Sequence, residues 1–272
     1  MNWWEAVLLG LIQGLTEFLP VSSSGHLVLG QYLLGLTSTG DVTFEVFVHF
    51  GTTLSILTVY RHRVLELIRA TWEGVRRPAQ LGARYREDSE FRFALFILLT
   101  MVPTGIAYVL FHERIESAFG DPRFTCAMLL VTGVLLLLTL LRRNPTGRLS
   151  PVKAFVIGVA QSFAMLPGLS RSGATICAAL YQNVEGKKAA DFSFLMLLPV
   201  VIGATLLKIL EMLEIGGGGG EPLGILAIGT VAAYVSGIGA IKAMIDLVAR
   251  GNIHYFAFYL FIVGTLGLIF IG

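Results

Sequence analysis

The sequence predicts an all-α membrane protein made of two inverted-topology repeats, each a re-entrant helical hairpin followed by three transmembrane helices. The first observation is composition: of the 272 residues, 55% are hydrophobic and 14% are charged, whereas soluble chains average about 25% charged residues. The second is a set of apolar runs long enough to cross a bilayer. The third is a pair of similar polar segments. Together they predict a single integral-membrane domain over residues 1–272.

The first polar segment covers residues 13–26 and reads QGLTEFLPVSSSGH. Gln13 and Glu17 are four residues apart, so they share one face if the segment begins as a helix. Pro20 cannot continue that helix without losing a backbone hydrogen bond. A second helix is expected to begin near Gly25, because the preceding serines are favoured helix caps. The segment therefore predicts a helix, a break and a second helix.

The start of that second helix brings hydroxyl groups close to an imidazole. Ser22, Ser23 and Ser24 are consecutive and His26 follows, so Ser23 and His26 can meet on the first turn. A hydroxyl beside an imidazole is the arrangement of a nucleophile and its base. A packed, hydrogen-bonded histidine is the other interpretation. The free N–H groups and the dipole of a helix start favour a bound anion.

The second polar segment, residues 161–175, reads QSFAMLPGLSRSGAT and resembles the first. Gln13 matches Gln161, 148 positions later, although Pro20 misses Pro167 by one position at that offset. Similarity at a fixed offset indicates an internal repeat. The apolar stretches beside each polar segment are too short to span alone. Broken backbone at membrane depth is tolerated inside protein or facing water, so each segment predicts a re-entrant hairpin.

Three candidate spans follow each hairpin, which gives a first repeat over about 1–141 and a second over about 152–272. The candidate spans are about 43–60, 93–111, 124–141, 191–213, 223–248 and 253–271. An odd number of crossings in each half makes the second copy insert upside down. This is the logic of many transport folds, in which the two broken segments meet near the bilayer midplane.

The distribution of charge orients the chain. If residues 61–92 are cytoplasmic, the loops predicted on that side carry 15 of the 20 Lys and Arg residues, and the opposite side carries two. Cytoplasmic loops carry an excess of positive charge, so both termini are expected on the outer side. No basic cluster comes with aromatic residues, so a nucleic-acid partner is not expected.

Polar groups at membrane depth are costly and therefore mark functional candidates. Arg171 is the clearest, because its guanidinium matches phosphate oxygens; a buried ion pair with Glu17 or Glu45 is the alternative. The candidate phosphate-binding residues are Ser22, Ser24, Ser170, Ser172 and Thr175. Glu17 suits a hard divalent cation or acid/base work, and Gln13 can assist with a carbonyl oxygen. The residues alone leave open whether Glu45 and His49 face the site.

These motifs resemble the bacterial undecaprenyl-diphosphate phosphatases of the bacitracin-resistance, BacA type. The resemblance covers essentially the whole chain, including the Glu/Gln-xxx-Glu pattern at Gln13 and Glu17 and the two serine segments. It implies inverted repeats in the bacterial plasma membrane and homodimers in many members. It also implies hydrolysis of the C55 isoprenyl diphosphate with a divalent cation, magnesium or calcium. Gln13 stands where many members have an acid, which removes one metal carboxylate.

A mechanism follows as a hypothesis. Ser23 attacks, His26 takes its proton, and Glu17, Arg171 and the helix starts bind the cation and the phosphates. His26 as nucleophile and direct attack by water both stay open. The alternative function is an inverted-repeat transporter or flippase of a lipid phosphate.

Overall fold

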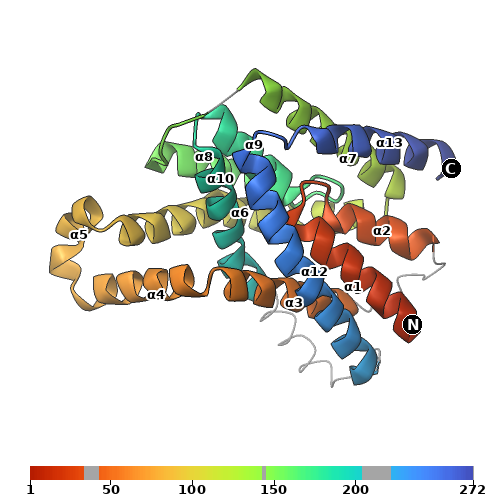
Figure 1. The fold of residues 1–272 in the computed structure, drawn as a ribbon, viewed down its shortest axis with the longest axis horizontal. Coiled ribbons are helices and arrows are strands. Elements are labelled where there is room, and N and C mark those ends of the chain that lie inside the picture. The colour runs from red at the N-terminus through yellow and green to blue at the C-terminus, as the bar shows by residue number, and fades with distance from the viewer. Residues whose placement is uncertain (34–42, 143–144, 204–221, 272) are drawn as a thin grey trace.

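The computed structural model describes residues 1–33, 43–142, 145–203 and 222–271, which are almost entirely helical (Figure 1). The helices are α1 (Trp3–Phe18), α2 (Ser23–Leu33), α3 (Thr43–Val59), α4 (Arg61–Arg76), η1 (Pro78–Gln80), α5 (Leu81–Glu87), α6 (Ser89–Phe119), α7 (Pro122–Leu138), η2 (Thr139–Leu141), α8 (Pro151–Phe163), α9 (Arg171–Tyr181), α10 (Gly186–Leu195), α12 (Leu223–Ala249) and α13 (Tyr255–Phe270). The expected all-α class is therefore confirmed for the described part of the chain.

Among the described helices, three are long and apolar enough to cross a membrane: α6, α7 continued by η2, and α12. They cover the spans expected at 93–111, 124–141 and 223–248. At two further expected spans the structure has the shorter apolar helices α3 and α13. The span expected at 191–213 is not one continuous helix, because α10 ends at Leu195 and a turn follows at Met196. The part of that span beyond residue 203 lies outside the described residues.

The first break lies between α1 and α2. The chain becomes extended at Leu19, ahead of Pro20, which ends α1. The next helix begins at Ser23, two residues earlier than the sequence suggested, and the Ser22 hydroxyl accepts the Gly25 N–H at 3.2 Å as a cap. Ser22 has a φ of 72°, a left-handed conformation that costs a non-glycine residue about 1–2 kcal/mol.

The second break lies between α8 and α9 and ends in a similar cap, in which the Ser170 hydroxyl accepts the Gly173 N–H at 3.1 Å. Gly168 in this break has a φ of +87°, and a Cβ there would lie 2.1 Å from the Thr125 carbonyl oxygen of α7. Only glycine combines that backbone conformation with that close approach.

Helix α7 supports the second break. The Thr132 hydroxyl donates to the Gly168 carbonyl and accepts the Ser170 N–H, both at 3.1 Å. The two breaks also touch each other, because the Ser172 hydroxyl donates to the Leu19 carbonyl at 3.1 Å. The chain thus brings together two segments that are about 150 residues apart in sequence.

Small residues allow the remaining helices to pack closely. A Cβ at Gly10 of α1 would lie 2.4 Å from the Gly229 carbonyl oxygen of α12. In the second half, a Cβ at Gly158 of α8 would lie 2.8 Å from the Thr100 carbonyl oxygen of α6. Helices α1 and α8 therefore each pack against a long helix from the other half of the chain.

Candidate active site

Glu17 is the centre of a buried polar cluster at the point where the two breaks meet. It lies in the last turn of α1, and only 6% of its surface is exposed. One carboxylate oxygen, Oε1, accepts from Arg171 Nη2 at 2.5 Å. The other, Oε2, accepts from the Ser23 hydroxyl at 2.6 Å and from Gln13 Nε2 at 2.9 Å. The structure therefore brings together the acid, the serine and the arginine that the sequence singled out.

Arg171 satisfies both interpretations offered by the sequence. It forms the buried ion pair with Glu17, yet its other terminal nitrogen, Nη1, is buried and has no hydrogen-bond partner within the described residues. An unpaired buried donor on a charged group costs free energy unless a ligand satisfies it. One arm of the guanidinium is therefore held by Glu17, and the other has no hydrogen-bond partner among the described residues.

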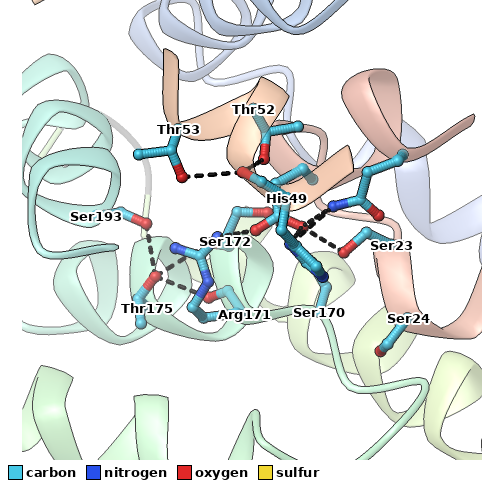
Figure 2. Close-up of polar contacts among 12 residues, drawn as sticks. Ser23, Ser24, His49, Thr52, Thr53, Ser170, Arg171, Ser172, Thr175 and Ser193 are labelled. Atoms are coloured by element: carbon cyan, nitrogen blue, oxygen red, sulfur yellow. Dashed lines mark hydrogen bonds and ion pairs between the residues drawn. The ribbon is translucent and has the colours of Figure 1, made fainter. Parts of the chain in front are cut away.

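His49 belongs to the polar cluster around Glu17, whereas Glu45 has a different partner. His49 Nδ1 lies 3.0 Å from Gln13 Nε2 and 3.8 Å from Glu17 Oε2. Glu45, one turn earlier on α3, accepts instead from Gln31 Nε2 at 3.2 Å. Figure 2 shows His49 close to Ser23 and Arg171, which come from α3, α2 and α9 respectively. The four-residue spacing of Glu45 and His49 indicated that both lie on one face of α3. It could not show which of the two reaches Glu17.

His26 is not paired with Ser23, which corrects the expectation from the sequence. Its Nδ1 lies 2.8 Å from the Ser22 carbonyl oxygen, and its Nε2 lies 2.7 Å from the Tyr259 hydroxyl. Ser23 turns instead to Glu17 because its hydroxyl points toward the end of α1. Tyr259 was missed because a tyrosine in an apolar run gives no signal in a single sequence.

The expected phosphate-binding hydroxyls differ in their availability. Ser22 and Ser170 accept backbone N–H groups as caps. Thr175 lies 2.6 Å from the Ser193 hydroxyl and donates to the Arg171 carbonyl. Ser172 donates to the backbone of the first break. Figure 2 shows Ser24 apart from the central cluster. Most of these hydroxyls thus shape the two turns in the structure described.

Comparison with known proteins assigns the family. The family model described as Bacitracin resistance protein BacA matches residues 6–266. The chain belongs to the BacA family. It is 66% identical over 270 residues to an undecaprenyl-diphosphatase of Salinibacter ruber, covering 98% of this chain and 99% of that protein. Undecaprenyl-diphosphatases of Christiangramia forsetii (41% identity; 99% and 98% covered) and Halothermothrix orenii (38%; 100% and 99%) are also similar.

A cation site in this BacA-family chain would rest on few protein ligands. Within the described residues, no group of three or more His, Cys, Asp or Glu side chains could hold a metal ion. Gln13 Oε1, however, is a buried acceptor without a hydrogen-bond partner in that same part of the chain, and it lies on the residue bonded to Glu17. An amide oxygen and a carboxylate suit a hard cation that takes its remaining ligands from water and phosphate. These donor types suit magnesium or calcium, but both Glu17 oxygens already accept hydrogen bonds in this structure.

Proposed function

We propose that this BacA-family protein hydrolyses undecaprenyl diphosphate to undecaprenyl phosphate and inorganic phosphate. The reaction recycles the lipid carrier of peptidoglycan synthesis in the bacterial plasma membrane and confers resistance to bacitracin, which sequesters the diphosphate. The observation that carries the proposal is the Ser23–Glu17–Arg171 chain of hydrogen bonds, in which Arg171 Nη1 has no partner among the residues that the structure describes. The high identity to curated undecaprenyl-diphosphatases over full length supports the substrate.

The diphosphate would enter between the two breaks. Arg171 Nη1 donates to a phosphate oxygen while Nη2 stays on Glu17, so the guanidinium remains oriented during binding. The first turn of α9, at whose start Arg171 lies, adds the partial positive charge of a helix N-terminus. Phosphoryl transfer depends mainly on positioning and electrostatic stabilisation, and this site supplies both from fixed groups.

Ser23 is the proposed nucleophile. Its hydroxyl attacks the terminal phosphorus, its proton passes to Glu17, and undecaprenyl phosphate leaves; water then hydrolyses the phosphoserine. Glu17 replaces His26 as the proton acceptor because it is the group that Ser23 contacts, at 2.6 Å. Attack by His26 or by water would give the same products without phosphoserine. Rapid quenching with a substrate labelled in its terminal phosphate separates these routes.

A divalent cation completes the proposed site. Gln13 Oε1 and Glu17 would hold it, which leaves a single protein carboxylate because the first position of the acidic pair is an amide here. When bound, the cation neutralises charge on the diphosphate. Arg171 and the α9 N-terminus orient the diphosphate from the other side of the site.

We infer the inverted repeats from contacts that recur in the two halves. Gln13 and Gln161 each donate through Nε2 and each leave a buried Oε1 without a partner among the described residues. Ser22 and Ser170 cap their helices alike. Helix α12 packs on α1, and α6 packs on α8, which is the crosswise pairing that a two-fold relation produces. On this basis the two breaks are re-entrant hairpins inserted from opposite sides.

The proposed orientation places both termini on the outer side. Figure 1 shows both chain ends at the end of the molecule opposite α5, and the arginine-rich residues 61–92 surround α5. The positive-inside rule then makes the α5 end cytoplasmic and the end with the two termini external. The homodimer that the resemblance implies stays a prediction, which the mass of the detergent-purified protein tests.

Phosphate release by the purified protein in detergent tests the function. We expect undecaprenyl diphosphate to yield one phosphate and undecaprenyl phosphate, with loss of turnover in chelator. A transporter or flippase, which the relatives' names do not favour, would release no phosphate without a membrane. Absence of release under conditions where the protein remains folded would refute the proposal.

A further inference from the structure

We propose that Tyr259 is a positioning residue of this site, a role that rests on the phosphatase function proposed above. Its hydroxyl holds His26, and His26 holds the turn at Ser22 that aims Ser23 at Glu17. Tyr259 lies on α13, 233 positions after His26 in the chain. The proposed chemistry uses no other group from that helix.

The hydrogen bonds of His26 fix the direction of this link. Nδ1 lies 2.8 Å from the Ser22 carbonyl oxygen, and a carbonyl oxygen can only accept, so Nδ1 carries a proton. In a neutral imidazole, Nε2 is then the acceptor. The Tyr259 hydroxyl, 2.7 Å away, must be the donor. The two rings also stack, with centroids 5.6 Å apart and planes inclined by 11°.

The other end of the link is the strained residue of the first break. The Ser22 carbonyl accepts two hydrogen bonds from His26, one from Nδ1 and one from the backbone N–H at 3.1 Å. Ser22 has the left-handed φ of 72°, which persists only where the surroundings enforce it. Ser23 is the next residue, so the conformation of Ser22 sets where the Ser23 hydroxyl points.

Helix α13 is a rigid support for Tyr259. One turn or more beyond it, a Cβ at Gly264 would lie 2.9 Å from the Cys126 carbonyl oxygen, and one at Gly267 2.3 Å from the Cys126 sulfur. This close packing fixes α13 against α7, the helix that also packs against the start of α2, where a Cβ at Gly25 would lie 3.1 Å from Leu129. A tyrosine anchored there has a defined position relative to Ser22, as a positioning role requires.

The link also explains why His26 does not serve Ser23. Its Nε2 lone pair is engaged by Tyr259 and its Nδ1 proton by Ser22, so both ring nitrogens are occupied. His26 could accept a proton from Ser23 only by breaking one of these bonds. The geometry therefore separates a proton acceptor, Glu17, from a residue that holds the turn.

The Tyr259→Phe variant tests the hydroxyl while keeping the ring stack. We expect kcat for phosphate release to fall about tenfold, the effect of losing one neutral hydrogen bond. We expect KM to stay within about twofold, because Arg171 is untouched. Tyr255→Phe is the matched control, since Tyr255 lies one turn earlier on α13 and contacts His254; it should behave as wild type. An unchanged kcat in Tyr259→Phe overturns the proposal.

A double-mutant cycle tests whether Tyr259 acts through His26. In a His26→Gln background, Tyr259→Phe should lower kcat by less than about twofold further. A further tenfold loss would show that Tyr259 acts independently of His26 and would overturn the link.

Nitrogen NMR of histidine-labelled wild-type protein supplies a readout that needs no turnover and no folded variant of Tyr259. With the His26 signals assigned by their loss in His26→Gln, we expect a protonated Nδ1 and an unprotonated, hydrogen-bonded Nε2. A proton on Nε2 alone overturns the proposal. If the wild-type protein releases no phosphate, the proposed function is refuted. The NMR result still decides whether Tyr259 donates a hydrogen bond to His26.

Discussion

Replacing Arg171 with lysine separates the two arms of the guanidinium. Arg171 Nη2 is held by Glu17 at 2.5 Å, and Nη1 is buried without a partner in the described part of the chain. A lysine ammonium is a single charged point, so it can serve Glu17 or the phosphate but not both in the same geometry. The variant keeps the buried charge and loses one charge-assisted hydrogen bond, worth about 1.5–3 kcal/mol. That corresponds to a fall of about 10- to 150-fold in kcat/KM.

The assay is phosphate release from undecaprenyl diphosphate by purified protein in detergent, with thermal unfolding measured in parallel. Arg123→Lys on the exposed first turn of α7 is the control and should leave kcat/KM unchanged. We expect Arg171→Lys to unfold near the wild-type temperature. Arg171→Ala, in contrast, leaves Glu17 as an unpaired buried charge and should lower stability by about 3–5 kcal/mol. Wild-type kcat/KM in Arg171→Lys would refute the assignment of Nη1 to the phosphate.

Three further predictions address the nucleophile, the cation and the fold. Ser23→Ala should lower kcat by at least about 100-fold and abolish the acid-stable labelling of the protein by the substrate's terminal phosphate. Turnover near wild type would show that Ser23 is not the nucleophile. Gln13→Leu should raise the magnesium concentration needed for half-maximal phosphate release by about 10-fold, and an unchanged magnesium dependence would contradict the cation site. Gly168→Ala should lower the unfolding temperature because its Cβ would meet the Thr125 carbonyl in a backbone conformation that strains alanine, whereas Gly105→Ala, with open space around it, should not.

The sequence was sufficient to predict the charged residues of the site, because burying a charge without a partner costs free energy. An acid and an arginine at membrane depth must find partners, so Glu17 and Arg171 could be placed together across the chain, and they form an ion pair in the structure. The serines marked two helix starts because serine is a favoured cap, and Pro20 marked the end of α1. Helix α8 instead ends at Phe163, four residues before Pro167. The first break and the start of α9 therefore followed from local chemistry, whereas the end of α8 did not.

Other parts depended on contacts that one sequence does not encode locally. The Tyr259–His26 bond joins an apolar helix to a polar turn, and a tyrosine in an apolar run is equally typical of a bilayer interface. The choice between Glu45 and His49 depends on how far along α3 the site lies, which is set by packing. The turn at Met196 interrupts an apolar run that composition alone would make continuous.

A double-mutant cycle between the two breaks tests the central claim, that they form one site. Glu17→Gln changes the end of α1, Arg171→Lys changes the start of α9, and phosphate release gives kcat/KM for each single and double variant. The two side chains are joined by a direct hydrogen bond. We therefore predict that the double variant loses less transition-state stabilisation than the sum of the two single variants, by at least about 1.5 kcal/mol. Losses that add to within about 0.5 kcal/mol would show that the residues act separately and would contradict a shared site.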